Sequence, residues 1–270
     1  MRHERFEQEG PIRLDLRLPS GTISLDSHDE PATTVELDAT RDSEELREVI
    51  DSARIELRPH RDGHEVVVDV HRKRFKLFDF MGGEIILRVR APRGTDVAIT
   101  TASADTDARG SWGALKVSTA SGDLRFDELL GDVDIKTASG DIDLNRVGGR
   151  TSISSASGDV GVGEVAGDTT VRSASGDIEI GEALGSVTVQ TASGDQSVRS
   201  VSSGRVTMQS ASGDQTVGIA RGSRAFLDVK TMSGDASSEL DITDAPGEGE
   251  VPQVEVRATA MSGDIRVVRA

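Results

Sequence analysis

The tripeptide Ser-Gly-Asp recurs along this chain at a nearly fixed interval, and no other feature constrains the fold as strongly. Its copies begin at Ser121, Ser139, Ser157, Ser175, Ser193, Ser212, Ser233 and Ser262, after a variant, Ser103-Ala104-Asp105. The step is 18 residues over most of this run and lengthens to 19, 21 and 29 at its end. A fixed period of this size predicts a repeat architecture in which each unit stacks on its neighbours.

The residues between these corners alternate between apolar and polar, which is typical of strands buried on one face. The run Val187-Thr188-Val189-Gln190-Thr191 precedes one corner, and Ile178-Glu179-Ile180 follows another. A second series of glycines, from Gly113 to Gly222, falls between the Ser-Gly-Asp corners. Each repeat is therefore interpreted as a strand, a tight corner, a second strand and a looser corner.

Two topologies could use this repeat: an antiparallel meander and a parallel solenoid. We favour the solenoid, because near-identical residues at a fixed period are best explained if equivalent positions stack directly, about 4.8 Å apart. The expected fold is all-β, a single-stranded parallel β-helix or β-solenoid with coils of about 18 residues and one short N-terminal helix.

The residue before each Ser-Gly-Asp corner is almost always alanine. We expect these positions to form an inward column where the corner narrows and only small side chains fit. The column consists of Ala102, Ala120, Ala138, Ala156, Ala174, Ala192 and Ala211, followed by Met232 and Met261.

The corner aspartates would form a row of like charges along one edge, which is costly unless something offsets it. The structural interpretation is that each carboxylate accepts hydrogen bonds from backbone N–H groups of its own or a neighbouring corner. The alternative is a calcium site, since hard oxygen ligands suit this cation. One aspartate per coil is a sparse ligand set, so we favour no metal and expect no cofactor. The weak metal candidates are Asp123, Asp141, Asp159, Asp177, Asp195 and Asp214.

Composition narrows the function classes further. The 270 residues include no Cys, which excludes disulfides and thiolate chemistry. No motif brings a nucleophile and a base together, so we expect no enzyme and no catalytic residues. The net charge of −16 opposes nucleic acid as a partner, and no run is apolar enough for a membrane span. With no export signal recognised, the expected location is cytoplasmic.

The first hundred residues show the pattern of strand, corner and strand less regularly, for example at 14–25 and 86–99. We expect residues 1–100 to be a capping region of longer, degenerate coils, continuous as one domain with a regular solenoid over 101–270. Residues 42–54 combine early acidic residues with apolar Leu46, Val49 and Ile50, which predicts an amphipathic helix.

A basic, Phe-rich segment stands next to this helix. Basic residues interleaved with aromatics can contact an anionic surface, although in an acidic protein they more often pair with its own carboxylates. Its residues are the partner-binding candidates: Arg72, Lys73, Arg74, Phe75, Lys76 and Phe78.

The corner Thr119-Ala120-Ser121-Gly122-Asp123 and its copies, led in by Ala91-Pro92-Arg93-Gly94-Thr95-Asp96-Val97, resemble the bacterial "putative adhesin" β-strand-repeat family, whose function is unknown. The resemblance covers nearly the whole chain from about residue 14. It implies a right-handed single-stranded β-helix and transfers no catalytic or ligand residue. Some relatives are linked to cell-envelope stress in Gram-positive bacteria, which implies a sensory or scaffolding role.

The sequence thus predicts a non-enzymatic interaction or scaffold protein, an adhesin-like repeat rod with an unknown protein partner. Two alternatives remain open. One is end-to-end self-association into filaments, motivated by the final coil with Arg266 and Arg269, which carries no obvious cap. The other is a calcium-binding module that uses the aspartate row.

Overall fold

The computed structural model describes residues 1–7, 11–61, 63–70, 83–240 and 253–270. Its backbone is almost entirely β-structure with one short helix, and the chain forms two compact units, Met1–Gly140 and Asp141–Ala270. In both units the repeat strands are parallel, with partners one coil apart, which confirms the solenoid over the meander.

The described part of the Met1–Gly140 unit contains α1 and ten strands. Their bounds are β1 (Arg2–Glu7), β2 (Ile12–His28), β3 (Ala32–Ala39), α1 (Glu44–Ser52), β4 (Arg54–His60), β5 (Gly63–Asp69), β6 (Ile85–Pro92), β7 (Asp96–Trp112), β8 (Leu115–Ser121), β9 (Leu124–Leu129) and β10 (Val133–Ser139).

Parallel coils in this unit begin with β2, a 17-residue strand that pairs with β7 along most of its length. β7 in turn pairs with β8 through its first half and with β9 through its second half, as a strand that spans two sides of a coil must. The coil-like segments expected at 14–25 and 86–99 therefore do lie in β2, β6 and β7. Antiparallel pairs are added to these coils. β3 pairs antiparallel with β1 and with β6, and β4 and β5 form an antiparallel hairpin, while β5 and β6 also pair in parallel with β2.

The predicted helix is confirmed as α1. Ser43 caps its N-terminus by accepting a hydrogen bond on Oγ from the amide of Leu46 at 3.2 Å, and Glu44 and Glu45 complement the positive end of the helix dipole. Leu46, Val49 and Ile50 are buried, and α1 packs against β3.

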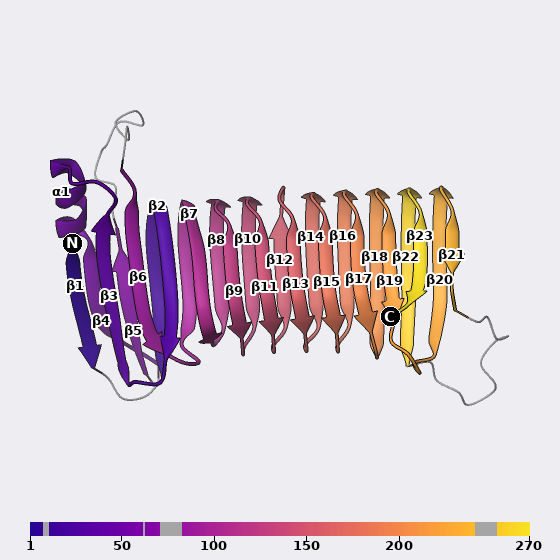
Figure 1. The fold of residues 1–270 in the computed structure, drawn as a ribbon, viewed down its shortest axis with the longest axis horizontal. Coiled ribbons are helices and arrows are strands. Elements are labelled where there is room, and N and C mark those ends of the chain that lie inside the picture. The colour runs from indigo at the N-terminus through magenta and orange to yellow at the C-terminus, as the bar shows by residue number, and fades with distance from the viewer. Residues whose placement is uncertain (8–10, 62, 71–82, 241–252) are drawn as a thin grey trace. The chain divides into compact units, whose positions relative to one another are not determined.

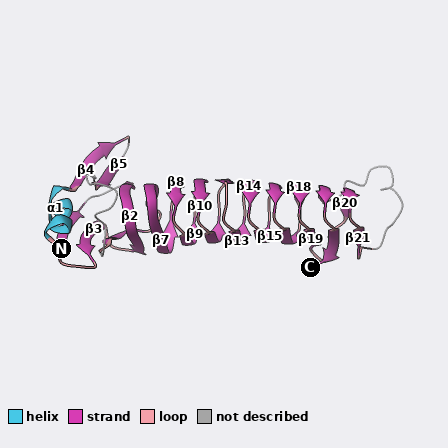
Figure 2. Ribbon diagram, turned by 90° about the horizontal axis from the view of Figure 1, so that it is seen from above, coloured by secondary structure: helices cyan, strands magenta, loops and turns pink. Residues whose placement is uncertain are grey.

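The Asp141–Ala270 unit is built from strand pairs, one strand of each pair on either side of the core (Figure 2). The bounds are β11 (Ile142–Val147), β12 (Thr151–Ser155), β13 (Val160–Val165), β14 (Thr169–Ser175), β15 (Ile178–Ala183), β16 (Val187–Ser193), β17 (Gln196–Val201), β18 (Gly204–Ser212), β19 (Gln215–Ile219), β20 (Ala225–Ser233), β21 (Ala236–Ser238), β22 (Val254–Ser262) and β23 (Ile265–Arg269).

The coils of this unit do not stack in chain order. β18 pairs with β22, and β22 pairs with β20, so the coil formed by β22 and β23 lies between β18/β19 and β20/β21 (Figure 1). The prediction that the final coil forms the open end is therefore wrong. The end coil is β20/β21, and Arg266 and Arg269 belong to a coil with neighbours on both sides. The 29-residue step before Ser262 reflects this change of order.

Candidate functional site

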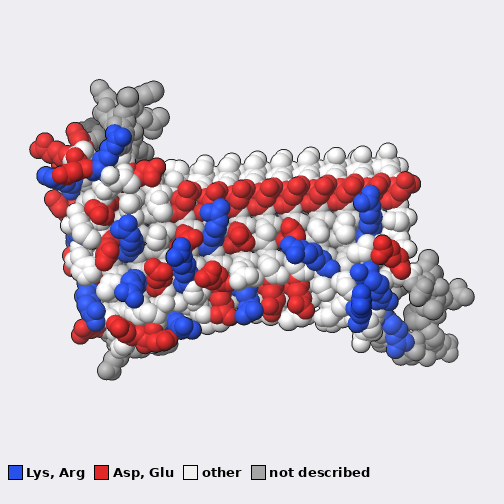
Figure 3. Space-filling model, viewed as in Figure 1, with Lys and Arg blue, Asp and Glu red and all other residues white. Residues whose placement is uncertain are grey.

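The corner aspartates of the Asp141–Ala270 unit are joined by one repeated hydrogen bond. In each case the backbone amide of one corner aspartate donates to Oδ1 of the aspartate one coil away, over 2.8 to 2.9 Å. The amide-to-carboxylate pairs are Asp159 to Asp141, Asp177 to Asp159, Asp195 to Asp177, Asp214 to Asp195, Asp264 to Asp214 and Asp235 to Asp264. Figure 3 shows the row that these carboxylates form. The prediction that backbone N–H groups stabilise the row is confirmed.

Hydrogen bonds of the same kind occur in the Met1–Gly140 unit. The amide of Asp123 donates to Oδ1 of Asp105 at 3.0 Å, and at the opposite corner the amide of Ala114 donates to Oδ1 of Asp96 at 2.7 Å. Both bonds span 18 residues, so they tie one coil to the next. In each unit, corner aspartates thus accept hydrogen bonds from backbone amides of a neighbouring coil.

No group of three or more His, Cys, Asp or Glu side chains that could hold a metal ion occurs within the described part of the chain. The weak metal candidates are instead placed one per coil. The carboxylates of Asp141, Asp159, Asp177, Asp195 and Asp214 each accept a hydrogen bond from the amide of the next corner. A calcium ion requires six to eight oxygen ligands.

The column of alanines does not face inward, and that prediction is wrong. Ala120, Ala174 and Ala192 are exposed, whereas the hydroxyl residue before each of them is buried, as at Thr119, Ser173 and Thr191. The physical reason is the strand alternation itself: Val187, Val189 and Thr191 are in phase, so Ala192 points outward.

Four hydroxyls at this position bind the backbone of their own corner. Each of the four donates to the carbonyl oxygen two residues later, from Thr137 to Ser139, Ser155 to Ser157, Ser173 to Ser175 and Ser210 to Ser212, at 2.7 to 2.8 Å. Each bond ties the inward end of one strand to the turn that follows it. The repeat is therefore better described as Thr/Ser-Ala-Ser-Gly-Asp. In these four copies the side chains of its first and last residues form hydrogen bonds with backbone groups at the corners. Thr191 instead donates to Oγ of Ser210 at 3.4 Å, and Oγ1 of Thr119 is buried without a hydrogen-bond partner among the described residues.

The outer face of β14, β16 and β18 carries aligned polar side chains. The strand register stacks Thr170 on Thr188 and Thr188 on Thr207. Two residues further on, Arg172 donates to Oε1 of Gln190 at 3.0 Å, and Nε2 of Gln190 donates to Oε1 of Gln209 at 3.0 Å. We call this surface the hydroxyl–amide face: Thr170, Arg172, Thr188, Gln190, Thr207 and Gln209.

The opposite sheet of the same unit is chemically different. Its outward positions include Gly163 and Gly181, and a Cβ at Gly181 would come within 2.2 Å of the Gly163 carbonyl oxygen. Charged pairs occupy others, such as Arg146 with Glu164 and Arg199 with Glu179. The regular column of hydroxyl and amide groups is thus a property of one face.

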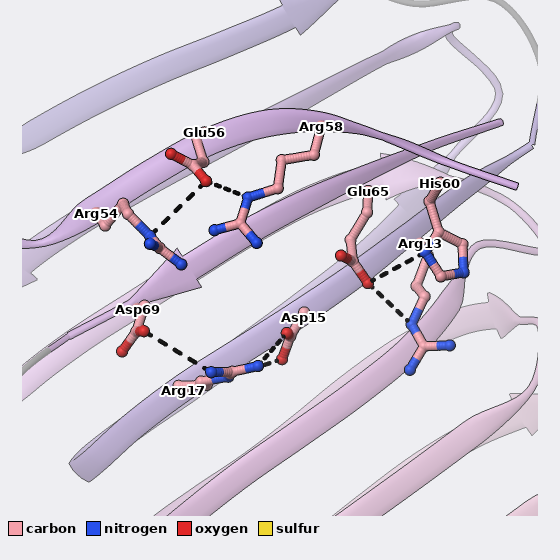
Figure 4. A network of polar contacts seen from close by, with 9 residues as sticks. All are labelled: Arg13, Asp15, Arg17, Arg54, Glu56, Arg58, His60, Glu65 and Asp69. Atoms are coloured by element: carbon pink, nitrogen blue, oxygen red, sulfur yellow. Dashed lines mark hydrogen bonds and ion pairs between the residues drawn. The ribbon is translucent and has the colours of Figure 1, made fainter.

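A second polar cluster lies on β2, β4 and β5 of the Met1–Gly140 unit (Figure 4). Arg17 contacts Asp15 at 2.7 Å and Asp69 at 3.9 Å, and the hydrogen bond to Asp15 raises the pKa of the Arg17 guanidinium above its usual value. Glu65 lies 3.3 Å from Arg13 and 3.9 Å from His60. These basic groups already face carboxylates of the same sheet. The cluster therefore holds three strands together, and exposed pairs of this kind contribute about 0–1 kcal/mol each.

Residues 13–268 match the family model described as Toastrack DUF4097. The chain belongs to the Toastrack DUF4097 family. No curated protein matches the sequence. Solved structures show distant likeness: a putative adhesin from Bacteroides fragilis NCTC 9343 has 10% identity and a TM-score of 0.49, covering 98% of this chain and 95% of that one.

Two further structures resemble this Toastrack chain at similar distance. A putative adhesin from Parabacteroides merdae ATCC 43184 has 10% identity and a TM-score of 0.40, with 99% of this chain and 96% of that chain covered. A putative cell adhesion protein from Clostridium sporogenes ATCC 15579 has 11% identity and a TM-score of 0.32, with 100% and 99% covered. The match of residues 13–268 to the family model confirms the family resemblance that the corner residues indicated.

The partner-binding candidates of the Toastrack chain, Arg72 to Phe78, lie outside the described residues, so they remain a prediction. Within the described ranges no helix combines the length and apolar character needed to cross a bilayer. Sequence reasoning missed the exposed apolar residues of the end coils, Phe226, Met232 and Met261. The signal was present in the two methionines, but it was assigned to the wrong side of the strand.

Proposed function

We propose that this Toastrack protein is a non-enzymatic interaction scaffold that binds a protein partner through the hydroxyl–amide face. The observation that carries the proposal is the in-register stacking of Thr188 on Thr207 and of Gln190 on Gln209. Over β14, β16 and β18 each strand presents a Thr hydroxyl in the same register, about 4.8 Å further along, and β16 and β18 each add a Gln amide.

This spacing points to the class of partner. Strands of any β-sheet lie about 4.8 Å apart, so a second protein with an exposed sheet meets each row of hydroxyl and amide groups with a row of its own. Arg172 is the one charged residue of this face, so a contact here also avoids the desolvation cost that carboxylates would add. A partner with an exposed β-sheet, carrying Thr, Ser, Asn or Gln, fits the surface best.

Similarity between coils supports binding over catalysis. Catalytic sites need a few groups with distinct roles gathered at one place, whereas the outward groups of β14, β16 and β18 repeat the same roles from coil to coil. A scaffold gains from this repetition, because many weak contacts at equal spacing add up.

The test is affinity capture from lysate and from envelope fractions with the full chain as bait. A Thr188→Lys/Thr207→Lys variant places two charges on the face, and a Ser197→Lys/Thr216→Lys variant places two on the opposite sheet of the same coils. Proteins captured by the wild type and the control, but lost with the first variant, would support the proposal. Capture that is equal for both variants, or no specific capture at all, would contradict it.

The basic segment at 72–78 provides a second candidate contact, supported by its sequence alone. An Arg72→Glu/Lys73→Glu/Arg74→Glu variant in the same capture experiment separates the two surfaces. Loss of the captured protein with this variant only would assign binding to the basic segment instead of the hydroxyl–amide face.

A further inference from the structure

The β20 strand forms an open edge of the Asp141–Ala270 unit. Among the described strands it pairs with β22 alone, so no described strand pairs with the backbone groups on its other side. Its inward side chains are also incompletely covered: Leu227 and Val229 are only half-buried, whereas their partners Val256 and Ala258 on β22 are fully buried. An open edge with uncovered core residues is a ready site for pairing with another strand.

Exposed apolar side chains gather at this edge. Met232 is 83% exposed, Met261 59% and Phe226 46%, and all three lie on β20 or β22. In the earlier coils the position equivalent to Met232 and Met261 is alanine, as at Ala192 and Ala211. Large apolar groups therefore replace small ones only in the two coils nearest the open end. Their burial is expected to favour contact with another surface.

The β20 sequence is complementary to itself. If a second β20 pairs antiparallel with Val229 opposite Val229, the register places Asp228 opposite Lys230 and Phe226 opposite Met232. Opposite charges then face each other twice, and each ring meets a thioether, a favourable pair. Within one chain Nζ of Lys230 already lies 2.9 Å from Asp228, and this contact lowers the pKa of the Asp228 carboxyl. The Asp228 carboxyl is therefore ionised at neutral pH.

We infer that β20 is a homodimer interface, in which two copies of this chain join their β20 edges antiparallel about a two-fold axis at Val229. The axis runs perpendicular to both sheets of the end coil, so the two half-covered cores also close on each other. The contact is isologous and therefore closes at two copies, unlike the head-to-tail filament considered from the sequence. It is separate from the hydroxyl–amide face and does not depend on the function proposed for it.

The test is the mass of the full chain in solution, measured by light scattering, with charge reversals at the edge. The wild type is expected at twice the chain mass of 28.6 kDa. Asp228→Lys alone places Lys opposite Lys, and Lys230→Asp alone places Asp opposite Asp, so each variant is expected to fall to the monomer mass. Mixing the two variants restores both opposite-charge pairs and should restore the dimer. Arg172→Asp, on β14 with strands on both sides, is the matched control and should stay dimeric.

A second variant keeps the test independent of the charge changes. The chain has no cysteine, so Val229→Cys introduces a single thiol at the two-fold axis. Directly opposed residues lie within the Cα separation that a disulfide needs, so oxidation should cross-link this variant. Lys230→Cys, which faces Asp228 in the same register, should cross-link far less. A monomeric wild type, a dimer that both reversals leave intact, a mass that grows beyond two copies, or equal cross-linking of the two cysteine variants would each overturn the inference.

Discussion

The backbone amide of Asp195 donates a hydrogen bond to Oδ1 of Asp177, 18 residues earlier in the chain, over 2.8 Å. The same aspartate that repeats at every corner therefore fixes the distance between consecutive corners. A charged acceptor strengthens the bond, and the bond in turn offsets part of the repulsion between neighbouring carboxylates.

Replacement of Asp177 tests which of these two effects dominates. Asp177→Ala removes the acceptor and is expected to lower the free energy of unfolding by about 1 kcal/mol or more. Asp177→Asn keeps an acceptor oxygen and removes one charge from the row, so its loss should be smaller. Urea denaturation of both variants measures the difference. Equal losses would show that the charge, and not the geometry of the acceptor, stabilises the corner.

The second prediction concerns which side chains before the corner face inward and which face outward. Ser173→Ala removes the hydrogen bond from Oγ to the Ser175 carbonyl oxygen at 2.7 Å, with an expected loss of about 1 kcal/mol. Ala174→Leu adds a larger side chain at an exposed position and should change stability by no more than about 0.5 kcal/mol. Both are measured by denaturant unfolding. A strongly destabilised Ala174→Leu variant would instead support the inward placement first expected from the sequence.

Glycine is required at the corner for two separable reasons. Gly194 has a φ of +117°, and a Cβ there would lie 2.2 Å from the Gly176 carbonyl oxygen. Gly222 has a φ of +86° but nothing within 4 Å of such a Cβ. Gly222→Ala should therefore lower the free energy of unfolding only by the cost of a positive φ in alanine, about 1 kcal/mol. Gly194→Ala should lower it clearly more, because the neighbouring coil must also move. Thermal unfolding of the two variants measures both losses of stability. Similar losses would contradict a role for close stacking of the coils.

The general architecture was predictable, and the reasons lie in particular residues. Ser-Gly-Asp copies 18 residues apart, with Val187 and Val189 alternating between them, specify parallel stacking because only that topology superposes equivalent positions. The exchange of the last two coils was not predictable, because β20 and β22 carry the same corner motif and either could follow β18. Predicting the candidate site from the sequence depended on knowing which strand positions face inward and which face outward. Counting from Val189 would have placed Thr191 inside and Ala192 outside, and hence Met232 and Met261 on the surface.

Two buried glutamines break the apolar pattern and allow a stabilising substitution. Gln196 and Gln215 are stacked in register, and Oε1 of each is buried without a hydrogen-bond partner among the described residues. Ile178 occupies the equivalent position one coil earlier. Gln196→Ile removes an unsatisfied acceptor but also the two bonds from Nε2, to the Gln209 carbonyl oxygen at 2.7 Å and to Oγ1 of Thr191 at 3.1 Å. The net gain should be about 0.5 kcal/mol, since burial of the larger apolar surface is added. A lower melting temperature for Gln196→Ile would show that the two amide bonds outweigh both gains.

Calcium provides the last prediction, because it separates the structural interpretation of the aspartate row from the ligand-binding one. Each carboxylate between Asp141 and Asp214 has Oδ1 bound to the amide of the next corner, and successive carboxylates belong to different coils. Only one carboxylate per coil is available, and neighbouring coils lie about 4.8 Å apart, so the row supplies too few of the six to eight oxygens that calcium takes. The melting temperature should therefore be the same in millimolar calcium and in chelator. A cation that binds the folded state alone raises stability by mass action, so a rise of several degrees would show that the row binds metal. Loss of that rise in Asp177→Asn would then locate the ion at the row, whereas its persistence would locate the ion elsewhere.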